Sequence, residues 1–183
     1  MDNGASANGV IEKEINLSVA LKLQEFIEQS GGVAILTRDE DESTEDGGRK
    51  KGVTQKKSDL MERVTLMTTA NADIFVSIHM NKFPQSRYHG AQVFYANNGE
   101  ESKRLGNILQ KSLIQNIGDG NTRAAKLVSN NSVFVLKNAS VPAALVECGF
   151  LSNPSEALLL QDEGYQRKVA WSVYMGIMEY FVK

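Results

Sequence analysis

The sequence has a single cysteine, Cys148, few aromatic residues and no marked excess of either charge. One cysteine excludes an internal disulfide and a zinc site built from cysteine alone, so a metal would need histidine and carboxylate ligands. The formal net charge of −2 gives no basic footprint for nucleic acid. No apolar run approaches the roughly 18 residues of a membrane span, and the first residues are polar rather than signal-like. We therefore expect neither nucleic-acid binding nor an integral membrane segment in this chain.

What the sequence does contain is an alternation of helix and strand patterns over 183 residues, enough for one domain. This order predicts a three-layer α/β fold in which helices flank a mostly parallel central sheet. Residues 39–57 are charged, lack apolar periodicity and are expected to form a long surface loop. The predicted helices are 12–28, 58–72 (capped by Ser58), 100–117, a short one capped by Asn153, and about 165–181; the predicted strands are 33–38, 75–79, 91–95 and 143–148.

The most informative residue is His79, one of only two histidines. It ends a mostly apolar run, and Asn81 and Pro84 follow it, which is typical of a core strand that breaks into a loop. In open α/β sheets, ligands bind beyond the carboxyl ends of the strands. A strand-end histidine bonded to a neighbouring carbonyl explains the same position without any function.

Glu147 is a second anomaly, because it ends a strand that is otherwise alanine, leucine, valine and cysteine. Burial of an unpaired carboxylate is costly, so Glu147 should have a metal, a cation or a raised pKa, as a general base also requires. Pairing with Arg38 or Arg63 is the structural alternative. Cys148, its neighbour, should point to the opposite face of the sheet and lie in the core.

Glu12 stands at the start of the first predicted helix, where the helix dipole favours a carboxylate with or without a functional role. His89 lies in a polar connection and is interpreted as a surface residue. The sequence has no Gly-x-Gly-x-x-Gly pattern, no phosphate-binding loop and no Gly-x-Ser-x-Gly elbow, so nucleotide binding and serine hydrolysis have no support.

Together these segments resemble the zinc-dependent N-acetylmuramoyl-L-alanine amidases of bacterial cell-wall hydrolysis, and most of all the spore-cortex amidase of endospore formers. The resemblance covers nearly the whole chain. It is carried, in the order of the family, by residues 12–17, Thr37-Arg38, residues 77–81 and residues 141–153, and for the spore-cortex subfamily by residues 122–126 and 153–157.

The resemblance implies one zinc ion per chain, with Glu12 and His79 as ligands and Glu147 as the base that activates water. Asn81 and Arg63 are implied as residues of the site wall or of the surroundings of the ligands. In the family a further histidine ligand follows a first strand, in a loop of the Asp-Pro-Gly-His-Gly-Gly type. Neither that loop nor that strand is found in residues 1–183, so we expect both upstream of Met1.

The implied reaction is hydrolysis of the amide between N-acetylmuramic acid and the L-alanine of the stem peptide, in the cell wall or the spore cortex and therefore outside the cytoplasm. Peptidoglycan is then the partner, and an activating protein partner stays open. The alternative is a catalytically silent peptidoglycan-binding or regulatory domain that keeps the amidase fold. A metal-free hydrolase is a third reading, in which chelators would not affect activity.

Overall fold

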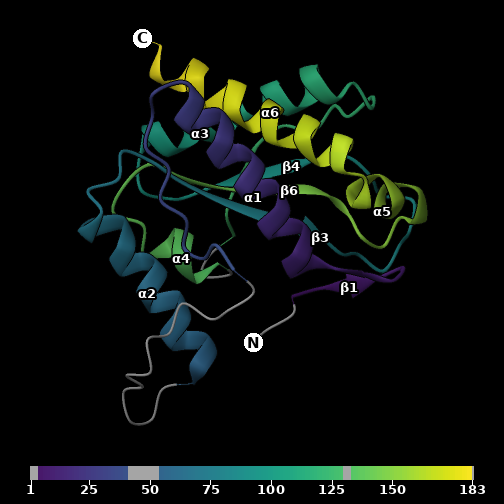
Figure 1. The fold of residues 1–183 in the computed structure, drawn as a ribbon, viewed down its shortest axis with the longest axis horizontal. Helices are drawn as coiled ribbons and strands as arrows, with labels where there is room; N and C mark the ends of the chain where they lie inside the picture. The colour runs from purple at the N-terminus through teal and green to yellow at the C-terminus, as the bar shows by residue number, and fades with distance from the viewer. Residues whose placement is uncertain (1–3, 41–53, 130–132, 183) are drawn as a thin grey trace.

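The computed structural model describes residues 4–40, 54–129 and 133–182. Most of the predicted charged loop, residues 41–53, lies outside the described residues. The main sheet has four strands in the order β3-β6-β4-β5 (Figure 1). Two of its three strand pairs are parallel and one, β4 with β6, is antiparallel, so the mostly parallel sheet is confirmed. The strands are β3 (Phe75–Asn81), β4 (Gln92–Tyr95), β5 (Lys126–Leu127) and β6 (Ala143–Phe150).

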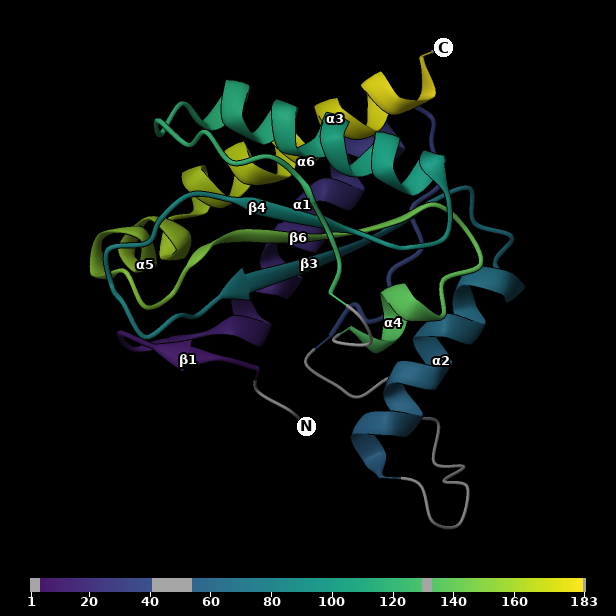
Figure 2. The same ribbon diagram turned by 180° about the vertical axis from the view of Figure 1, so that it is seen from behind.

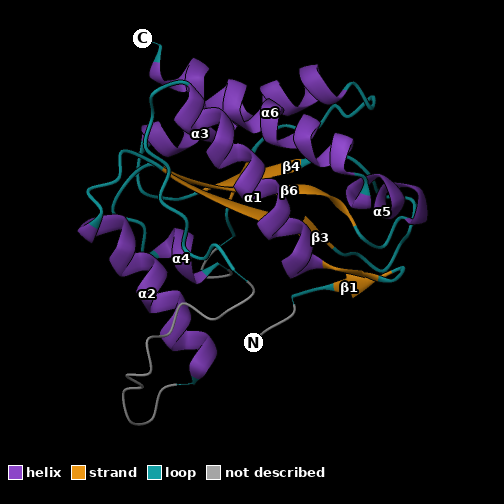
Figure 3. Cartoon of the chain, viewed as in Figure 1, coloured by secondary structure: helices purple, strands orange, loops and turns teal. Residues whose placement is uncertain are grey.

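Helices cover both faces of this sheet, as Figures 2 and 3 show. Three long helices lie on one face, α2 and α4 lie on the other, and α5 stands at one end of the sheet. The predicted three-layer arrangement is therefore present. The helices are α1 (Glu12–Gln29), α2 (Gln55–Thr69), α3 (Glu100–Ile117), α4 (Phe134–Lys137), α5 (Pro154–Gln161) and α6 (Glu163–Phe181).

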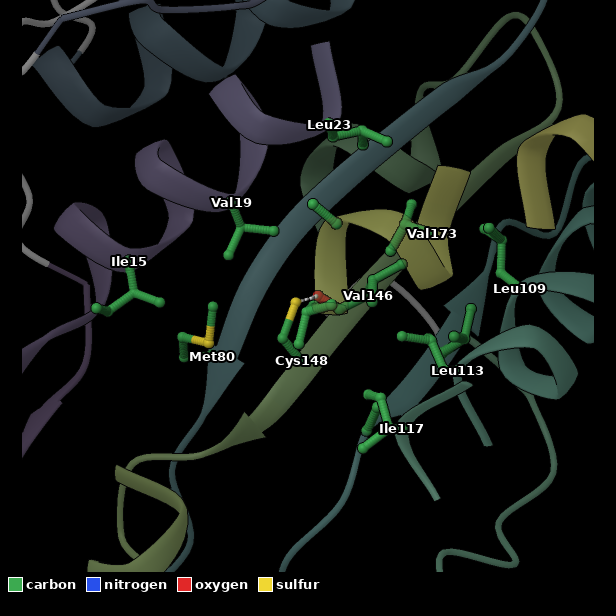
Figure 4. Close-up of a cluster of buried hydrophobic side chains, with 14 of the residues drawn as sticks. Ile15, Val19, Leu23, Met80, Leu109, Leu113, Ile117, Val146, Cys148 and Val173 are labelled. Carbon is green, nitrogen blue, oxygen red and sulfur yellow. Dashed lines mark hydrogen bonds between the residues drawn. The ribbon is translucent and has the colours of Figure 1, made fainter. Parts of the chain in front are cut away.

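Side chains along β6 alternate between the two faces of the sheet, and each face packs against its own layer of helices. Ala144, Val146 and Cys148 lie in the large cluster with α1, α3 and α6, whereas Ala143 and Leu145 lie in a smaller cluster with α4. Figure 4 shows Val146 and Cys148 among apolar side chains of the three long helices. The prediction that Cys148 is a core residue is confirmed, since its thiol is fully buried.

A short hairpin leads the chain into α1. Strands β1 (Ser6–Ala7) and β2 (Val10–Ile11) pair in antiparallel fashion. The two residues between them, Asn8 and Gly9, both have positive φ, the combination that favours Asn-Gly in tight hairpin turns. The backbone N–H of Glu12 then donates to the carbonyl of Ala5 at 2.9 Å. The hairpin thereby fixes where the first helix begins.

One predicted strand is absent, and the predicted start of the second helix was wrong. Residues 33–38 form no strand, and the side chains of Val33 and Ile35 are 87% and 55% exposed. A strand needs a hydrogen-bonding neighbour, and a cavity of about 1210 Å³ separates this segment from β3. Helix α2 begins at Gln55 rather than near Ser58, because the hydroxyl of Thr54 caps it by accepting from the N–H of Lys57.

Candidate active site

Three polar side chains share one face of the sheet at the carboxyl ends of β3 and β6. His79 pairs with Glu147 in the parallel register of these strands. Since Cys148 and Val146 belong to the main core, Glu147 points to the opposite face. Val76 and Ile78 pack against the same core, so Ser77 and His79 also point away from it. The sheet therefore brings Glu147 and His79 to one site, as the sequence predicts.

Glu12 reaches this site from the start of α1, and its carboxylate is almost fully buried. Its Oε1 accepts from Nδ1 of His79 at 2.9 Å and from the N–H of Met80 at 3.3 Å, and its Oε2 accepts from the N–H of Ala5 at 2.6 Å. Burial acts to raise the pKa of Glu12, but the bonds from His79 and the backbone outweigh it and lower the pKa. Glu12 is therefore ionised near neutral pH.

A close backbone approach makes room for this carboxylate. Gly4 has a φ of +66°, and a Cβ built there would lie 2.5 Å from Oε2 of Glu12. Any other residue at this position would push the Glu12 side chain away from the N–H of Ala5. Gly4 and Ala5 thus help to hold the carboxylate of Glu12 in place.

Hydrogen bonds hold the imidazole of His79 at both nitrogens. Nδ1 lies 2.9 Å from Oε1 of Glu12, and Nε2 lies 3.0 Å from the hydroxyl oxygen of Ser77. Sequence reasoning missed Ser77, although its position two residues before His79 on the same strand face is a usable signal. The pair Glu12–His79 is a carboxylate and an imidazole in direct contact, the kind of ligand set that zinc prefers.

Glu147 lies beside this pair with an unsatisfied carboxylate. Its Oε2 is buried and makes no hydrogen bond to the described residues. Burial raises the pKa of Glu147 to about 7, an effect that the positive potential of His79 opposes and the negative charge of Glu12 reinforces. A carboxylate with a pKa near neutrality, without a partner of its own, has the properties of a general base.

The two arginines that offered a structural explanation for Glu147 are bound elsewhere. Arg63 lies on α2, where it forms an ion pair with Asp59 at 3.1 Å and donates to the hydroxyl of Thr37 at 2.9 Å. Arg38 donates to the carbonyls of Lys13 and Glu40. Arg63 lines the same cavity as Glu12 and His79, so the structure places it at the wall of that space.

The remaining candidates lie around the ends of the same strands. Asn81 is the last residue of β3, and its carbonyl accepts from the N–H of Leu151 at 2.8 Å. His89 is exposed in the connection after β3, as predicted, and its carbonyl accepts from Arg123. Among the described residues, no group of three histidine, cysteine or carboxylate side chains is placed to hold a metal ion.

The sequence did not reveal the role of Glu156. Its position three residues after Asn153 predicts a capping box, in which the glutamate would reach back to the helix start. Asn153 does cap α5, but Glu156 turns away and accepts from the N–H groups of Gly90 and Phe150. These contacts connect two distant segments and leave no signal in the local sequence.

The fold and this site define a three-layer α/β protein in which strand ends bring a buried carboxylate next to an imidazole–carboxylate pair. The family profile described as N-acetylmuramoyl-L-alanine amidase matches residues 1–179. The chain therefore belongs to the N-acetylmuramoyl-L-alanine amidase family. It is a peptidoglycan amidase, an enzyme that hydrolyses the amide between N-acetylmuramic acid and L-alanine. Amidases of this family are generally zinc-dependent.

Individual relatives agree with this assignment. The chain is 37% identical over 182 residues to the germination-specific N-acetylmuramoyl-L-alanine amidase of Bacillus subtilis, covering 100% of this chain and 76% of that protein. Among solved structures it is similar to the CwlD amidase of Clostridioides difficile in complex with the GerS lipoprotein, with 42% identity and a TM-score of 0.90 over 98% of this chain and 92% of that chain. The amidase AmiC2 of Nostoc punctiforme is 28% identical, with a TM-score of 0.85 over 100% and 91% of the two chains.

Proposed function

We propose that Glu147 is the general base of the amidase reaction and that Glu12 and His79 are zinc ligands. The observation that carries this proposal is the buried, unsatisfied Oε2 of Glu147 beside the Glu12–His79 pair. A buried carboxylate without a partner is costly to folding, so a role in the reaction accounts for its presence. The raised pKa of Glu147, about 7, suits a group that must both take and return a proton.

The donor set fits zinc in type but not in number. Zinc accepts carboxylate oxygen and imidazole nitrogen, and its catalytic sites have three protein ligands. Glu12 and His79 supply two, and ligation by His79 would replace its hydrogen bond to Glu12 or to Ser77. Zinc held by Glu12, His79 and a third ligand would supply an acidic water molecule and polarise the scissile carbonyl. Glu147 takes the proton of the attacking water at its carboxylate and returns it to the departing amine of L-alanine.

We propose that the third ligand enters with an additional strand, which occupies the cavity between β3 and residues 33–38. This cavity extends along the unpaired edge of β3 as far as Glu12 and His79. A strand parallel to β3 would pair with that edge, cover the exposed Val33 and Ile35, and end beside the ligand pair. Residues 1–183 would then be a single catalytic domain completed by a strand and a histidine-bearing loop upstream of Met1.

Asn81 and Arg63 are proposed as residues of the site wall. Asn81 ends β3 two residues after His79, where a substrate above the strand ends would contact it. Arg63 connects α2 to Thr37 across the cavity, so it holds the segment against which the additional strand would lie. Its ion pair with Asp59 means that its contribution is to position this wall rather than to provide a free charge.

The biological setting follows from the relatives. We propose that the enzyme acts outside the cytoplasm on cell-wall or spore-cortex peptidoglycan, and that it acts in formation of the muramic lactam of the cortex. Support comes from the germination-specific relative and from the CwlD structure. That structure contains a lipoprotein, which supports an activating protein partner for this chain as well. None of the described helices is long and apolar enough to cross a membrane.

Zinc stoichiometry and release of stem peptide from purified muropeptides test the proposal together. With the proposed additional strand and histidine-bearing loop present, we expect about one zinc per chain and stem-peptide release that a chelator abolishes; residues 1–183 alone should bind zinc weakly or not at all. His79→Ala should lose zinc and activity, whereas His89→Ala, the only other histidine, should keep both. Equal zinc loss in both variants would refute the ligand assignment. Binding to the wall without release of stem peptide would instead indicate the catalytically silent domain.

A further inference from the structure

A carboxylate outside the reaction centre is bound to two segments that border it. The Glu156 side chain is 5% exposed. Its Oε1 accepts from the N–H of Gly90 at 2.7 Å, and its Oε2 accepts from the N–H of Phe150 at 2.7 Å. Each oxygen thus accepts from one backbone donor. Burial raises the pKa of this carboxyl group, and the two N–H donors oppose that rise. The two donors are 60 residues apart along the chain: Phe150 ends β6, and Gly90 lies just before β4, the strand that pairs with β6.

One of these donors, the N–H of Phe150, lies at an irregularity in the sheet. His79 pairs with Glu147, but Asn81, two residues later, pairs with Phe150, three residues later. Strand β6 therefore has one residue more than β3 between these pairs, which is a β-bulge immediately after Glu147. The regular ladder resumes where Leu151 donates to the carbonyl of Asn81 at 2.8 Å. Bulges next to active sites re-aim side chains, and the N–H of Phe150 within this one donates to Glu156.

The other donor, the N–H of Gly90, lies just before β4, the second strand that pairs with β6 at Glu147. Gly90 leads into β4, where Gln92 pairs with Glu147 in the antiparallel register. The carbonyls of residues 89 and 90 accept from Arg123, and the carbonyl of Ala91 accepts from Asn121 at 2.6 Å. Side chains therefore fix this short segment, and Glu156 connects it to β6 through the N–H of Phe150. The same carboxylate holds the bulge after Glu147 and the entrance of the strand paired with it.

Two glycines allow this close approach. A Cβ built on Gly149 would lie 2.7 Å from Oε1 of Glu156, and the φ of Gly149 is not in the positive region, so only space forbids a larger residue there. Gly90 has a φ of +84°, and a Cβ on it would meet the side chains of Asn121 and Asp119 at 3.0 Å. Both positions require glycine because the carboxylate and its neighbours occupy the space.

We propose that Glu156 is a positioning residue for the amidase reaction: it fixes the bulge of β6 and the start of β4 and thereby aims Glu147. The inference rests on the proposed role of Glu147 as the base. Glu156 does not touch substrate or the reacting atoms. Glu156 acts through its hydrogen bonds to the N–H groups of Phe150 and Gly90. The first holds the β6 backbone just after Glu147, and the second holds the entrance to β4, the strand paired with Glu147.

Glu156→Gln tests this proposal, with Glu163→Gln as the matched control, since Glu163 is exposed in the first turn of α6. Glutamine has the same shape, but its NH₂ group would face one of the two N–H donors. In the full-length zinc-loaded enzyme we expect kcat to fall by about 10- to 100-fold, with KM within about twofold, as for other residues that orient a reacting group. The amide resonances of Gly90 and Phe150 should shift in the NMR spectrum, and the control should change neither kcat nor these resonances.

A second variant keeps the test decisive if Glu156→Gln does not fold. Gly149→Ala retains Glu156 in the sequence, but the added Cβ would lie 2.7 Å from Oε1 and displace the carboxylate, so it should shift the same two amide resonances and lower kcat in the same way. Shifted resonances with an unchanged kcat per folded molecule would show a purely structural role and overturn the proposal. A loss of kcat without any change at Gly90 and Phe150 would also overturn it. The NMR measurement does not depend on the reaction, so its result stands even if Glu147 is not the base.

Discussion

Replacement of Glu147 by glutamine separates the cost of this residue to folding from its use in the reaction. In the folded protein, burial raises the pKa of Glu147 from 4.5 to about 7. The folded state therefore holds the proton more tightly than the unfolded chain, and stability falls as the pH rises from the unfolded to the folded pKa. Above both pKa values the ionised carboxylate destabilises the fold by roughly 3 kcal/mol at most, whereas at about pH 5 the cost is roughly 1 kcal/mol.

Glu147→Gln removes this pH-dependent cost because the amide cannot ionise. We expect the metal-free variant to be more stable than the wild type by roughly 2 kcal/mol more at about pH 8.5 than at about pH 5. Urea unfolding at the two pH values, with a chelator present, measures this difference, since a bound cation would itself lower the pKa of Glu147. The same variant with zinc restored should bind the metal and release no stem peptide.

The control for this experiment is Glu163→Gln, because Glu163 is an exposed carboxylate of the same type. Its effect on the free energy of unfolding should be the same at both pH values. If Glu147→Gln were to stabilise the protein equally at both pH values, or to destabilise it at the higher one, Glu147 would have an ionic partner in the fold. Loss of zinc from the variant would make Glu147 a ligand instead of the base.

Two further predictions concern the packing behind the site. Gly106→Ala should destabilise the protein by about 1–3 kcal/mol, because a Cβ there would lie 2.8 Å from Cβ of Tyr95, where α3 packs on β4; urea unfolding beside Asn107→Ala, an exposed neighbour on the same helix, checks this. Ser102→Ala should cost about 1–3 kcal/mol, because it leaves the buried N–H of Ala143 without its acceptor at 2.8 Å; a melting temperature equal to that of the wild type would contradict this.

The sequence by itself determined the elements with strong periodicity. Helix α3 begins and ends at the predicted residues 100 and 117, and α1 and α6 lie where their apolar spacing predicts them. These segments have repeating apolar residues on one side, so burial of one face fixes both their type and their extent. Strands β3 and β6 were identified from a different pattern. Each contains a run of mostly apolar residues, which suits a strand that is covered on both faces.

The chemical character of the site was also visible in the sequence. A histidine and a glutamate at the ends of apolar strands are anomalies wherever the chain folds, because burial of such groups demands a partner or a function. The structure placed His79 opposite Glu147 and added Glu12 to them. The contact of Glu12 with His79 joins residues 67 positions apart, and periodicity carries no information about such a distance.

Only the tertiary structure decided the fate of residues 33–38 and the role of Glu156. The apolar segment 33–38 has the composition of a strand, yet it forms none, because a strand exists only when a neighbour accepts and donates its hydrogen bonds. Glu156 follows the local pattern of a helix cap, yet its carboxylate binds Gly90 and Phe150. Sequence patterns determine which face of an element is buried, whereas the partners of a backbone edge or of a buried carboxylate depend on segments that only folding brings together.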